Sequence, residues 1–152
     1  NPVYMNGRSY RLRGRQMATK FGEIMLSTSE RQQVIDITGE IEGFVRGSGV
    51  SDGLCVAFSL HSTTAIVVNE GEEGLKEDVV RKIGEDYPRG AGWEHDRIDD
   101  NADAHLAGAT IGPAVTLIIK AGRLVLGTWQ RVLFIELDGP RGGRRIMLMA
   151  QG

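Results

Sequence analysis

The sequence predicts a single α+β domain, with a mainly antiparallel β-sheet or sandwich of seven or eight strands and two or three helices. The chain has 152 residues, of which 41% are hydrophobic, and it shows no internal repeat or linker. A chain of this length can bury about two thirds of its unfolded surface in one core. Its last third consists of short apolar runs separated by glycine-containing turns, whereas residues 72–84 have apolar residues at helical spacing.

In the first half of the chain, the pattern predicts strands at 23–27 and 33–37. Thr38 is expected to cap a helix over 39–46, because a hydroxyl oxygen can accept a hydrogen bond from the first helical turn. The nearly continuous apolar run at 54–60 is typical of a central strand, and 65–68 is predicted to be another strand. The element order therefore begins with strands, interrupted by one helix.

In the second half, Leu75, Val79 and Ile83 recur at helical spacing, which predicts an amphipathic helix over 72–84. Residues 93–113 have no strong period and are interpreted as a long polar loop, a kind of segment that is usually functional. The remaining strands are expected in two hairpins, one pairing 115–119 with 124–126 across Ala121-Gly122, the other pairing 132–137 with 146–149 across 138–143.

Composition excludes several protein classes. The net charge is −2, and no apolar run approaches the roughly 20 residues of a membrane helix. Cys55 is the one cysteine and lies in an apolar run, so it is expected to be a buried small side chain. We therefore expect a cytoplasmic protein without membrane association.

Residues 1–20 are predicted to form a basic N-terminal arm or an extension that precedes the domain of residues 21–152. The arm has five basic residues and no acidic one, namely Arg8, Arg11, Arg13, Arg15 and Lys20. Such a stretch can bind nucleic acid, although a solvated arm is the more common explanation. Met17-Ala18-Thr19-Lys20 has the character of a natural start, so residues 1–16 are left out of the fold argument.

The three histidines, His61, His95 and His105, all lie in polar clusters. Neutral imidazole is a common metal ligand and a proton carrier near pH 7. Their separations of 34 and 10 residues match no compact zinc motif, so the spacing alone leaves open both convergence on one site and three unrelated histidines. The loop that contains His95 and His105 also supplies carboxylates, which often hold the second nitrogen of a metal-bound histidine.

Two further polar clusters follow strands. Asn69-Glu70 closes the strand that begins after His61, and a strand of that length would hold its two ends about 16–20 Å apart. Gly127-Thr128-Trp129-Gln130 could allow close approach of a ligand or form a strand bulge. Arg141, together with Arg144 and Arg145, could clamp a phosphate or only keep a turn soluble. Nucleotide-binding and serine-hydrolase motifs such as GxGxxG, Walker A and GxSxG are absent from the sequence.

Taken together and in order, these motifs resemble the YjbQ-like family, whose members are often labelled secondary thiamine-phosphate synthases. The resemblance covers about residues 21–149. The segments that carry it are His61-Ser62-Thr63-Thr64-Ala65-Ile66, Asn69-Glu70, Trp93-x-His95, Asn101-Ala102-Asp103-Ala104-His105-Leu106, Gly127-Thr128-Trp129-Gln130 and Glu136-x-Asp138-Gly139-Pro140-Arg141. The chain departs from the family pattern at Ala107, Ala114 and Gly71-Glu72-Glu73-Gly74, which puts the identity of its substrate in doubt.

The resemblance implies a homotrimer with a divalent metal, probably zinc, held by His61, His95 and His105. It further implies a thiamine-phosphate synthase activity, which joins a hydroxymethylpyrimidine diphosphate to a thiazole phosphate. Glu70 and Asp103 are the candidate catalytic residues. The substrate and its phosphate would be bound by Asn101, Thr128, Gln130 and Arg141.

We therefore consider two main functions. The first is a metal-dependent enzyme that acts on a phosphorylated small molecule. The alternative is a non-catalytic, metal-binding trimeric module, favoured by the lack of a recognisable nucleophile. Nucleic-acid binding through the basic arm is a third and weaker possibility, and it predicts salt-dependent affinity that is lost with residues 1–16.

Overall fold

A computed structural model of the chain describes residues 3–5, 8–10 and 17–152. Near the N-terminus, β1 (Val3–Met5) and β2 (Arg8–Tyr10) pair antiparallel, with Val3 opposite Tyr10. The side chains of Arg8, Arg11, Arg13 and Arg15 lie outside the described residues, so the prediction of a basic arm stays a prediction.

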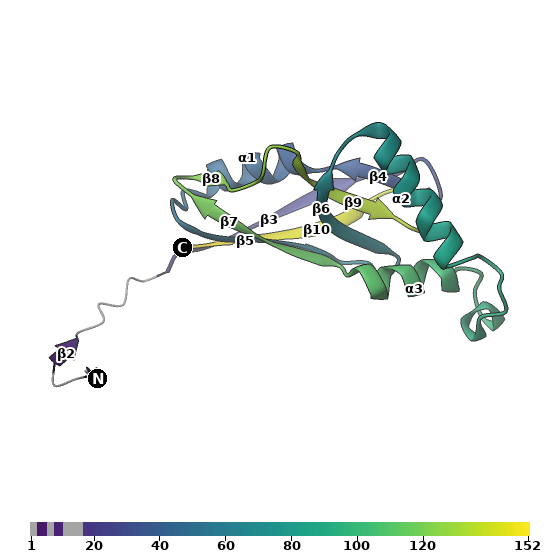
Figure 1. The fold of residues 1–152 in the computed structure, drawn as a ribbon, viewed down its shortest axis with the longest axis horizontal. Coiled ribbons are helices and arrows are strands. Elements are labelled where there is room, and N and C mark those ends of the chain that lie inside the picture. The colour runs from purple at the N-terminus through teal and green to yellow at the C-terminus, as the bar shows by residue number, and fades with distance from the viewer. Residues whose placement is uncertain (1–2, 6–7, 11–16) are drawn as a thin grey trace.

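The larger of the two sheets in residues 17–152 has five strands, and every neighbouring pair in it is antiparallel (Figure 1). From one edge to the other, its strands are β3 (Thr19–Leu26), β10 (Arg144–Gln151), β5 (Gly53–Ser59), β7 (Ala114–Lys120) and β8 (Arg123–Leu124). The predicted hairpin across Ala121-Gly122 is confirmed, since β7 pairs with β8 in the register Lys120 opposite Arg123.

The smaller sheet has three antiparallel strands. Its central strand is β9 (Gln130–Glu136), which lies between β4 (Gln33–Asp36) and β6 (Thr64–Glu70). The two sheets with three α-helices confirm the predicted α+β class and the number of strands in residues 17–152.

The helices are α1 (Thr38–Ser48), α2 (Glu73–Asp86) and α3 (Ala102–Ile111), with a short 3₁₀ helix η1 (Glu94–Arg97) before α3. Within the described residues, no helix combines the length and apolar character that crossing a membrane requires. The helix predicted at 72–84 is confirmed, since it corresponds to α2.

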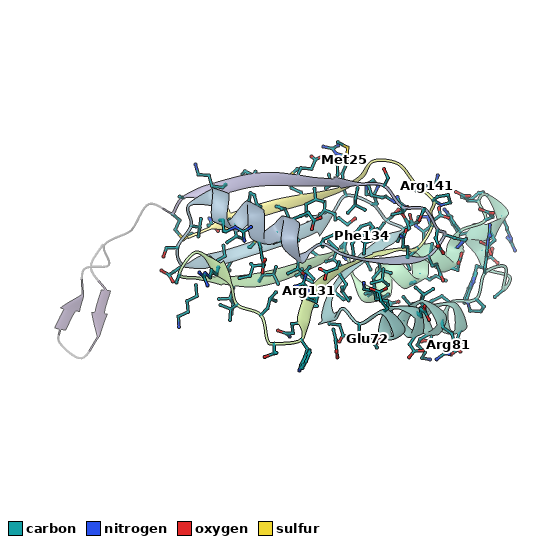
Figure 2. The ribbon with its side chains drawn as sticks, turned by 90° about the horizontal axis from the view of Figure 1, so that it is seen from above. Met25, Glu72, Arg81, Arg131, Phe134 and Arg141 are labelled. Atoms are coloured by element: carbon teal, nitrogen blue, oxygen red, sulfur yellow. The ribbon has the colours of Figure 1, made fainter. Side chains whose placement is uncertain are left out.

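The main core lies between the inner face of the five-stranded sheet and a second layer made by α1 and the three-stranded sheet. Its largest fully buried side chain is Phe134 of β9, which lies inside the molecule in Figure 2. Ile41 and Val45 of α1 and Ile146 and Leu148 of β10 pack in the same cluster. The alternation of buried and exposed residues along β10 is the pattern expected when one face of a strand meets a core.

A second, smaller core covers the other face of the three-stranded sheet. There Ile135 and Leu137 pack with Ile83 of α2 and with Ala104 and Ala107 of α3. The small side chains of α3 allow this helix to lie close to the sheet. The helix therefore brings its polar residues to the edge where the two sheets meet.

The outer face of the five-stranded sheet exposes several large apolar side chains around an ion pair between Glu23 and Arg145. Phe21 and Met25 of β3 are both 69% exposed, and Met25 points away from the body of the molecule in Figure 2. The strand registers place Leu54, Phe58 and Ile118 on this same face, and these side chains are also exposed. We call this surface the outer face.

One predicted pairing is wrong. Residues 132–137 and 146–149 do not form a hairpin, because β9 belongs to the three-stranded sheet and β10 to the five-stranded sheet. Both strands are central, so each already has a neighbour on either side. The segment 138–143 carries the chain from one sheet to the other, where its backbone bonds to Arg31 O through Gly139 N and to Thr28 N through Arg141 O.

The interpretation of residues 93–113 as an irregular loop is also wrong, since this segment contains η1 and α3. α3 shows no helical period because alanine and glycine occupy half of its ten residues. In addition, residues 101–104 at its start are all buried whatever their polarity. Periodicity detects a helix with one apolar face and one polar face, which α3 does not have.

Thr38 does not cap α1. It lies in the first turn, where its hydroxyl accepts a hydrogen bond from Val132 N at 2.8 Å. Asp36 Oδ1 instead accepts from Thr38 N at 2.9 Å. The threonine thus joins the helix to the neighbouring strand β9.

Candidate functional site

The side chains of His95 and His105 meet at the start of α3. Their ring centroids are 4.8 Å apart, and the ring planes cross at 74°. η1 places His95, while Asp96 Oδ1 accepts a hydrogen bond from Ala102 N at 3.1 Å and so joins η1 to α3. Trp93 anchors the other side of η1 by donating its indole N–H to Pro88 O. Two of the three histidines therefore share one place.

Within the described part of the chain, three buried side-chain atoms have no hydrogen-bond partner, and all of them belong to this segment. They are His95 Nε2, Asp96 Oδ2 and Asn101 Oδ1. An unpartnered buried polar atom costs about 1–3 kcal/mol, and one in a native fold calls for a ligand, ion or water. Asn101 is itself buried, and its Nδ2 is already used in a hydrogen bond to Asp138 Oδ2 at 3.0 Å. The start of α3 thus has unused capacity to bind a ligand.

Asp103 also lies at the start of α3, but its carboxylate is already paired. Arg31 donates to both of its oxygens, at 3.0 and 3.2 Å, and the aspartate is only 3% exposed. Arg31 also lies 3.8 Å from Asp138. Asp103 therefore anchors α3 to the chain before β4 and offers no free base in this arrangement.

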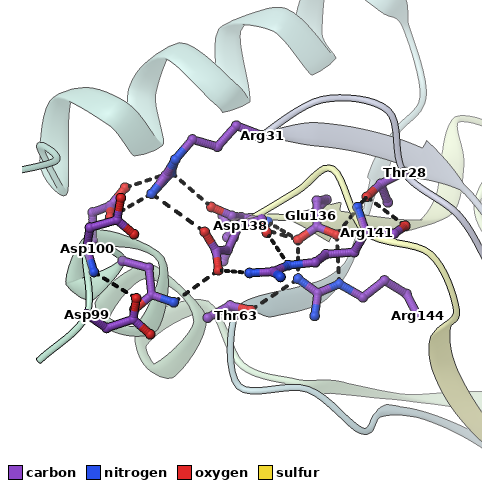
Figure 3. A network of polar contacts seen from close by, with 12 residues as sticks. Thr28, Arg31, Thr63, Asp99, Asp100, Glu136, Asp138, Arg141 and Arg144 are labelled. Atoms are coloured by element: carbon purple, nitrogen blue, oxygen red, sulfur yellow. Dashed lines mark hydrogen bonds and ion pairs between the residues drawn. The ribbon is translucent and has the colours of Figure 1, made fainter.

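The guanidinium of Arg141 is likewise already hydrogen-bonded, in this case to Asp138. Its Nε donates to Asp138 O at 2.9 Å and its terminal nitrogen to Asp138 Oδ2 at 2.8 Å (Figure 3). Burial raises the pKa of Asp138, but hydrogen bonds from Asn101 and Arg141 outweigh burial and hold that pKa below its usual value. Asp138 is thus ionised and bridges Asn101 to Arg141, close to the unpartnered atoms.

Beneath these residues lies a buried ion pair between Glu136 and Arg144. Arg144 Nε and a terminal nitrogen donate to the two carboxylate oxygens at 2.7 and 2.6 Å, and Glu136 is 0% exposed. Thr28 donates to Glu136 at 2.9 Å, and Thr63 accepts from Arg144 at 3.1 Å (Figure 3). This network joins both sheets to the turn that carries His61.

His61 uses one ring nitrogen to hold its own position. Its Nε2 accepts a hydrogen bond from Arg145 N at 2.8 Å. Burial lowers the pKa of His61, and the positive charge of Arg144 lowers it further. A neutral imidazole that accepts at Nε2 has its proton on Nδ1. In this arrangement His61 has no free lone pair for a metal.

His61 and His105 nevertheless line the same open pocket, which has a volume of about 740 Å³. Ser62 joins them at its polar end. The rest of the wall is mainly apolar and includes Phe58, Leu60, Leu106, Ala109 and Pro113. A few polar groups that converge in a mainly apolar pocket are typical of sites for small molecules.

Glu70, Thr128 and Gln130 do not lie in this region. Glu70 and Gln130 are directly opposite each other at the far ends of β6 and β9. Six residue steps of strand separate Thr64 from Glu70, which corresponds to about 20 Å. The residues predicted from the sequence thus form two groups within one chain. Glu70, Thr128 and Gln130 form one group, and the histidines, Asn101, Asp103 and Arg141 form the other.

The three histidines do not form a ready-made metal centre. Among residues whose placement is described, no group of three or more histidine, cysteine, aspartate or glutamate side chains is arranged to hold a metal ion. His95 and His105 fit a metal as a pair, with the unpartnered Nε2 of His95 and Oδ1 of Asn101 as candidate donors. His61 would fit only after release of its bond to Arg145 N.

Sequence analysis missed Arg31, Thr28 and the pairing role of Glu136 and Arg144. A signal existed for Glu136, because a carboxylate inside the apolar run 132–137 must find a buried partner. No comparable signal marks Arg31, whose partner Asp103 is 72 residues away. Only the fold brings those two together.

Comparison with known proteins gives consistent matches along the chain. The model of the family described as UPF0047 protein YjbQ-like matches residues 22–152. A UPF0047 protein of Archaeoglobus fulgidus is 46% identical over 128 residues, which cover 84% of this chain and 98% of that protein. A UPF0047 protein of Methanothermobacter thermautotrophicus is 42% identical and covers 86% and 90% of the two chains.

Solved structures show the same fold. The crystal structure of a YbjQ-like protein of unknown function from Sulfolobus solfataricus superposes with a TM-score of 0.89 at 42% identity, covering 90% of this chain and 99% of that one. A hypothetical protein of Aeropyrum pernix gives a TM-score of 0.85 at 42% identity, covering 88% and 98%.

Proposed function

The chain belongs to the YjbQ-like UPF0047 family, and from this premise we propose that it is a metal-dependent enzyme that acts on a phosphorylated small molecule. The observation that carries the proposal is the contact of His95 with His105 beside three buried, unpartnered polar atoms. The adjoining pocket, with His61 and His105 at its polar end, provides room for a substrate.

In this proposal His95 and His105 hold a divalent metal, with zinc as the expected ion, because imidazole nitrogen is a preferred ligand of zinc. A bound zinc ion supplies a Lewis acid that polarises a phosphate oxygen or a water molecule. Asn101 orients a ligand through Oδ1, its Nδ2 being fixed by Asp138. His61, whose Nε2 accepts from Arg145 N, has its proton on Nδ1 and in this proposal donates it to the substrate rather than binding the metal.

Thiamine-phosphate synthesis is the narrower form of this proposal, taken from the family resemblance alone. It requires binding of two phosphorylated partners. Of the predicted ligands of the substrate and its phosphate, Arg141 is the cationic one near the histidines, and its bond to Asp138 must break before it can face an anion. Thr128 and Gln130, at the other end of β6 and β9, can take part only if another copy of the chain supplies them.

We also propose that the protein is a homotrimer. The support is the outer face, where β3, β5 and β7 expose the large apolar side chains of Phe21, Met25, Leu54, Phe58 and Ile118. Monomeric proteins rarely expose contiguous apolar patches larger than a few hundred Å², and larger ones mark interfaces. Light scattering tests the assembly directly, with a mass of three chains as the expected result.

The metal content of the purified chain tests the enzyme proposal. We expect about one zinc per chain after purification without chelator, and loss of that metal in His105→Ala. Glu94→Gln is the matched control, because Glu94 lies on η1 but pairs only with Arg97 at the surface. Full metal occupancy in His105→Ala would contradict the site. Absence of metal even after reconstitution would leave the histidines with acid–base or structural roles.

The alternative is a non-catalytic metal-binding trimeric module. It predicts a different mass by light scattering after the same protein is treated with a chelator. If the metal only supports assembly, removing it with a chelator dissociates the trimer. If the metal serves catalysis at His95 and His105, the mass by light scattering stays at three chains. Turnover of phosphorylated substrates with metal present then distinguishes the enzyme from the module.

A further inference from the structure

The hairpin between β7 and β8 holds two positive charges side by side. Lys120 and Arg123 lie directly opposite each other in the register of these strands, and both side chains are exposed. Like charges at directly opposite positions destabilise an antiparallel pair. Within residues 17–152, no ion pair joins either side chain to a carboxylate. The register thus keeps two cations together at a cost in stability that a bound anion would remove.

Hydrogen bonds from the turn fix the tip of this hairpin in place. Gly122 N donates to Ser51 O at 2.8 Å, and Ala121 N donates to Asp52 Oδ1 at 3.2 Å. Ala121 and Gly122 have φ values of +51° and +72°, and positive φ at both central residues is the mark of a tight two-residue turn. The backbone positions of the two flanking cations are therefore set before any ligand arrives.

A third cation lies beside the hairpin. Arg46, in the last turn of α1, and Arg123 line the same pocket, which has a volume of about 300 Å³. Glu42 also lines this pocket, and one of its oxygens lies 4.0 Å from Arg46. One carboxylate is thus present with two guanidiniums, which leaves an excess of positive charge in a hollow that can accept a phosphate group.

The chain enters the domain at this same end. Ala18 N donates to Gly152 O at 3.0 Å, and β10 ends beside the start of β5, which in turn pairs with the end of β7. Lys20, the second residue of β3, is exposed here. The preceding residues 1–17 contain four arginines and no acidic residue. We call the four exposed side chains of the domain at this place the basic end, namely Lys20, Arg46, Lys120 and Arg123.

Acidic residues gather away from the basic end. Residues 70–100 contain eleven acidic residues and five basic ones, and they include α2 and η1. In Figure 1 the C-terminus and β8 lie at one end of the molecule, whereas α2 and α3 lie toward the other. The net charge of −2 is therefore the sum of two oppositely charged regions. Such a separation directs the basic end of a protein toward a polyanion.

We propose that the basic end binds the phosphate backbone of a nucleic acid. Cations on β3, α1 and the β7–β8 hairpin can contact successive phosphates, whereas one isolated phosphate would use only the pocket between Arg46 and Arg123. Six of the eight basic residues in the basic end and in residues 1–17 are arginines. The planar guanidinium of arginine donates two parallel hydrogen bonds to a phosphate group, while an anionic membrane attracts lysine and arginine alike. The proposal depends neither on the metal site nor on the homotrimer.

The salt dependence of binding tests the proposal in the full chain. Anisotropy of a short, labelled single-stranded DNA gives the affinity as the salt concentration is raised. Lys120→Ala combined with Arg123→Ala is expected to weaken binding and to lower the slope of log affinity against log salt by about 1.4, since each phosphate contact contributes about 0.7 for a single strand. Removal of the opposed charges should leave the thermal unfolding temperature unchanged or higher.

Arg81→Ala combined with Lys82→Ala is the matched control. It removes the same charge from α2, where the two side chains pair with Asp78 and Asp86 at the surface. We expect this variant to bind DNA with the affinity and the salt slope of the natural chain. Equal losses in both double variants would show that only net charge matters, which overturns a defined site.

Other sources of phosphate give different outcomes. At constant ionic strength, displacement of the DNA by inorganic phosphate at an equal concentration would overturn the nucleic-acid site in favour of a single-phosphate site. Binding to vesicles of phosphatidylglycerol without binding to DNA would overturn it in favour of a membrane surface. An unchanged salt slope in the hairpin variant, with binding lost when Arg8, Arg11, Arg13 and Arg15 are replaced by glutamine, would assign binding to the arm alone and overturn the basic end. Loss of slope confined to the hairpin variant supports the proposal.

Discussion

Glu136 accepts two hydrogen bonds from the guanidinium of Arg144, at 2.7 and 2.6 Å, inside the molecule below the turn that carries His61. The same carboxylate accepts from the backbone N–H groups of Leu137 and Asp138 and from Thr28. Every oxygen of this buried ion is thus satisfied, and Arg144 in turn bonds to Thr63. The pair therefore positions the candidate site as well as closing the core.

Replacing Glu136 tests this role. Glu136→Gln leaves the guanidinium of Arg144 buried without its counter-ion, and breaking such a pair costs about 3–5 kcal/mol. We expect a loss of that order in the free energy of unfolding measured with urea. Asp78→Asn is the control, because Asp78 pairs with Arg81 at the surface, and it is expected to change stability little.

Glu136 also predicts how stability depends on pH. Burial raises its pKa, but hydrogen bonds from Arg144, Asp138 N and Thr28 outweigh burial, so its pKa in the folded protein lies below the usual value. A lowered carboxyl pKa stabilises the fold above the unfolded pKa of about 4.3, and this contribution is lost as the pH falls through the folded pKa. Acid unfolding curves should therefore be steeper below about pH 4.3 for the natural chain than for Glu136→Gln. Equal slopes would show that Glu136 does not titrate with folding.

His61 is expected to be neutral at pH 7, with its proton on Nδ1. Burial, with Arg144 as the next cause, lowers its pKa, and its Nε2 accepts from Arg145 N. A lowered histidine pKa gives stability that is present above the unfolded pKa of about 6.5 and is lost as the pH falls toward the folded pKa. Nitrogen-15 NMR of the imidazole reports both the tautomer and the pKa. A proton on Nε2 at pH 7 would be incompatible with the bond to Arg145.

α3 packs closely on the turn that carries His61, so adding a single methyl group at Gly108 is expected to lower the stability of the fold. A Cβ on Gly108 would lie 2.8 Å from Ser62 O and 3.2 Å from Thr64 O, both backbone atoms. Gly108→Ala should therefore destabilise the fold by about 1–3 kcal/mol. Gly47→Ala in α1 is the matched control, because a Cβ there meets nothing within 4 Å, and helix propensity favours alanine by about 0.5–1 kcal/mol. Thermal unfolding of both variants should shift in opposite directions.

Cys55 is expected to be unreactive in the folded protein. The thiol is buried, and burial raises its pKa to about 11. Since the thiolate is the reactive form, a thiol reagent at pH 8 should modify Cys55 only as fast as the chain opens. Adding urea to the midpoint of unfolding is expected to accelerate modification strongly. Rapid modification without denaturant would contradict the packing of β5.

Local patterns predicted most of the elements but not the pairing of the last two strands. Apolar runs bounded by turn residues predicted the strand at β10, and helical spacing predicted α2. The pairing of β9 depends on strands that are distant along the chain. Asp36 of β4 lies opposite Leu133, 97 residues later, and Asn69 of β6 lies opposite Arg131, 62 residues later. No short-range pattern contains that information.

The candidate site shows the same limit. The sequence pointed to all three histidines, yet it did not reveal that Arg145 N occupies Nε2 of His61 while His95 and His105 meet. It also gave no means to foresee the pairing of Arg31 with Asp103, which depends on how α3 packs beside the chain before β4. Motifs named candidate residues, but their hydrogen bonds depend on the tertiary fold.

The place of β10 in the larger sheet has a consequence for biosynthesis. β3 and β5 each pair with β10, one on either side, and β10 follows both of them in the chain. While the ribosome is still making residues before Arg144, these two strands have no shared neighbour and leave their backbone edges open. The larger sheet therefore closes only after β10 has been made, and until then the open edges of β3 and β5 are available for pairing with other chains.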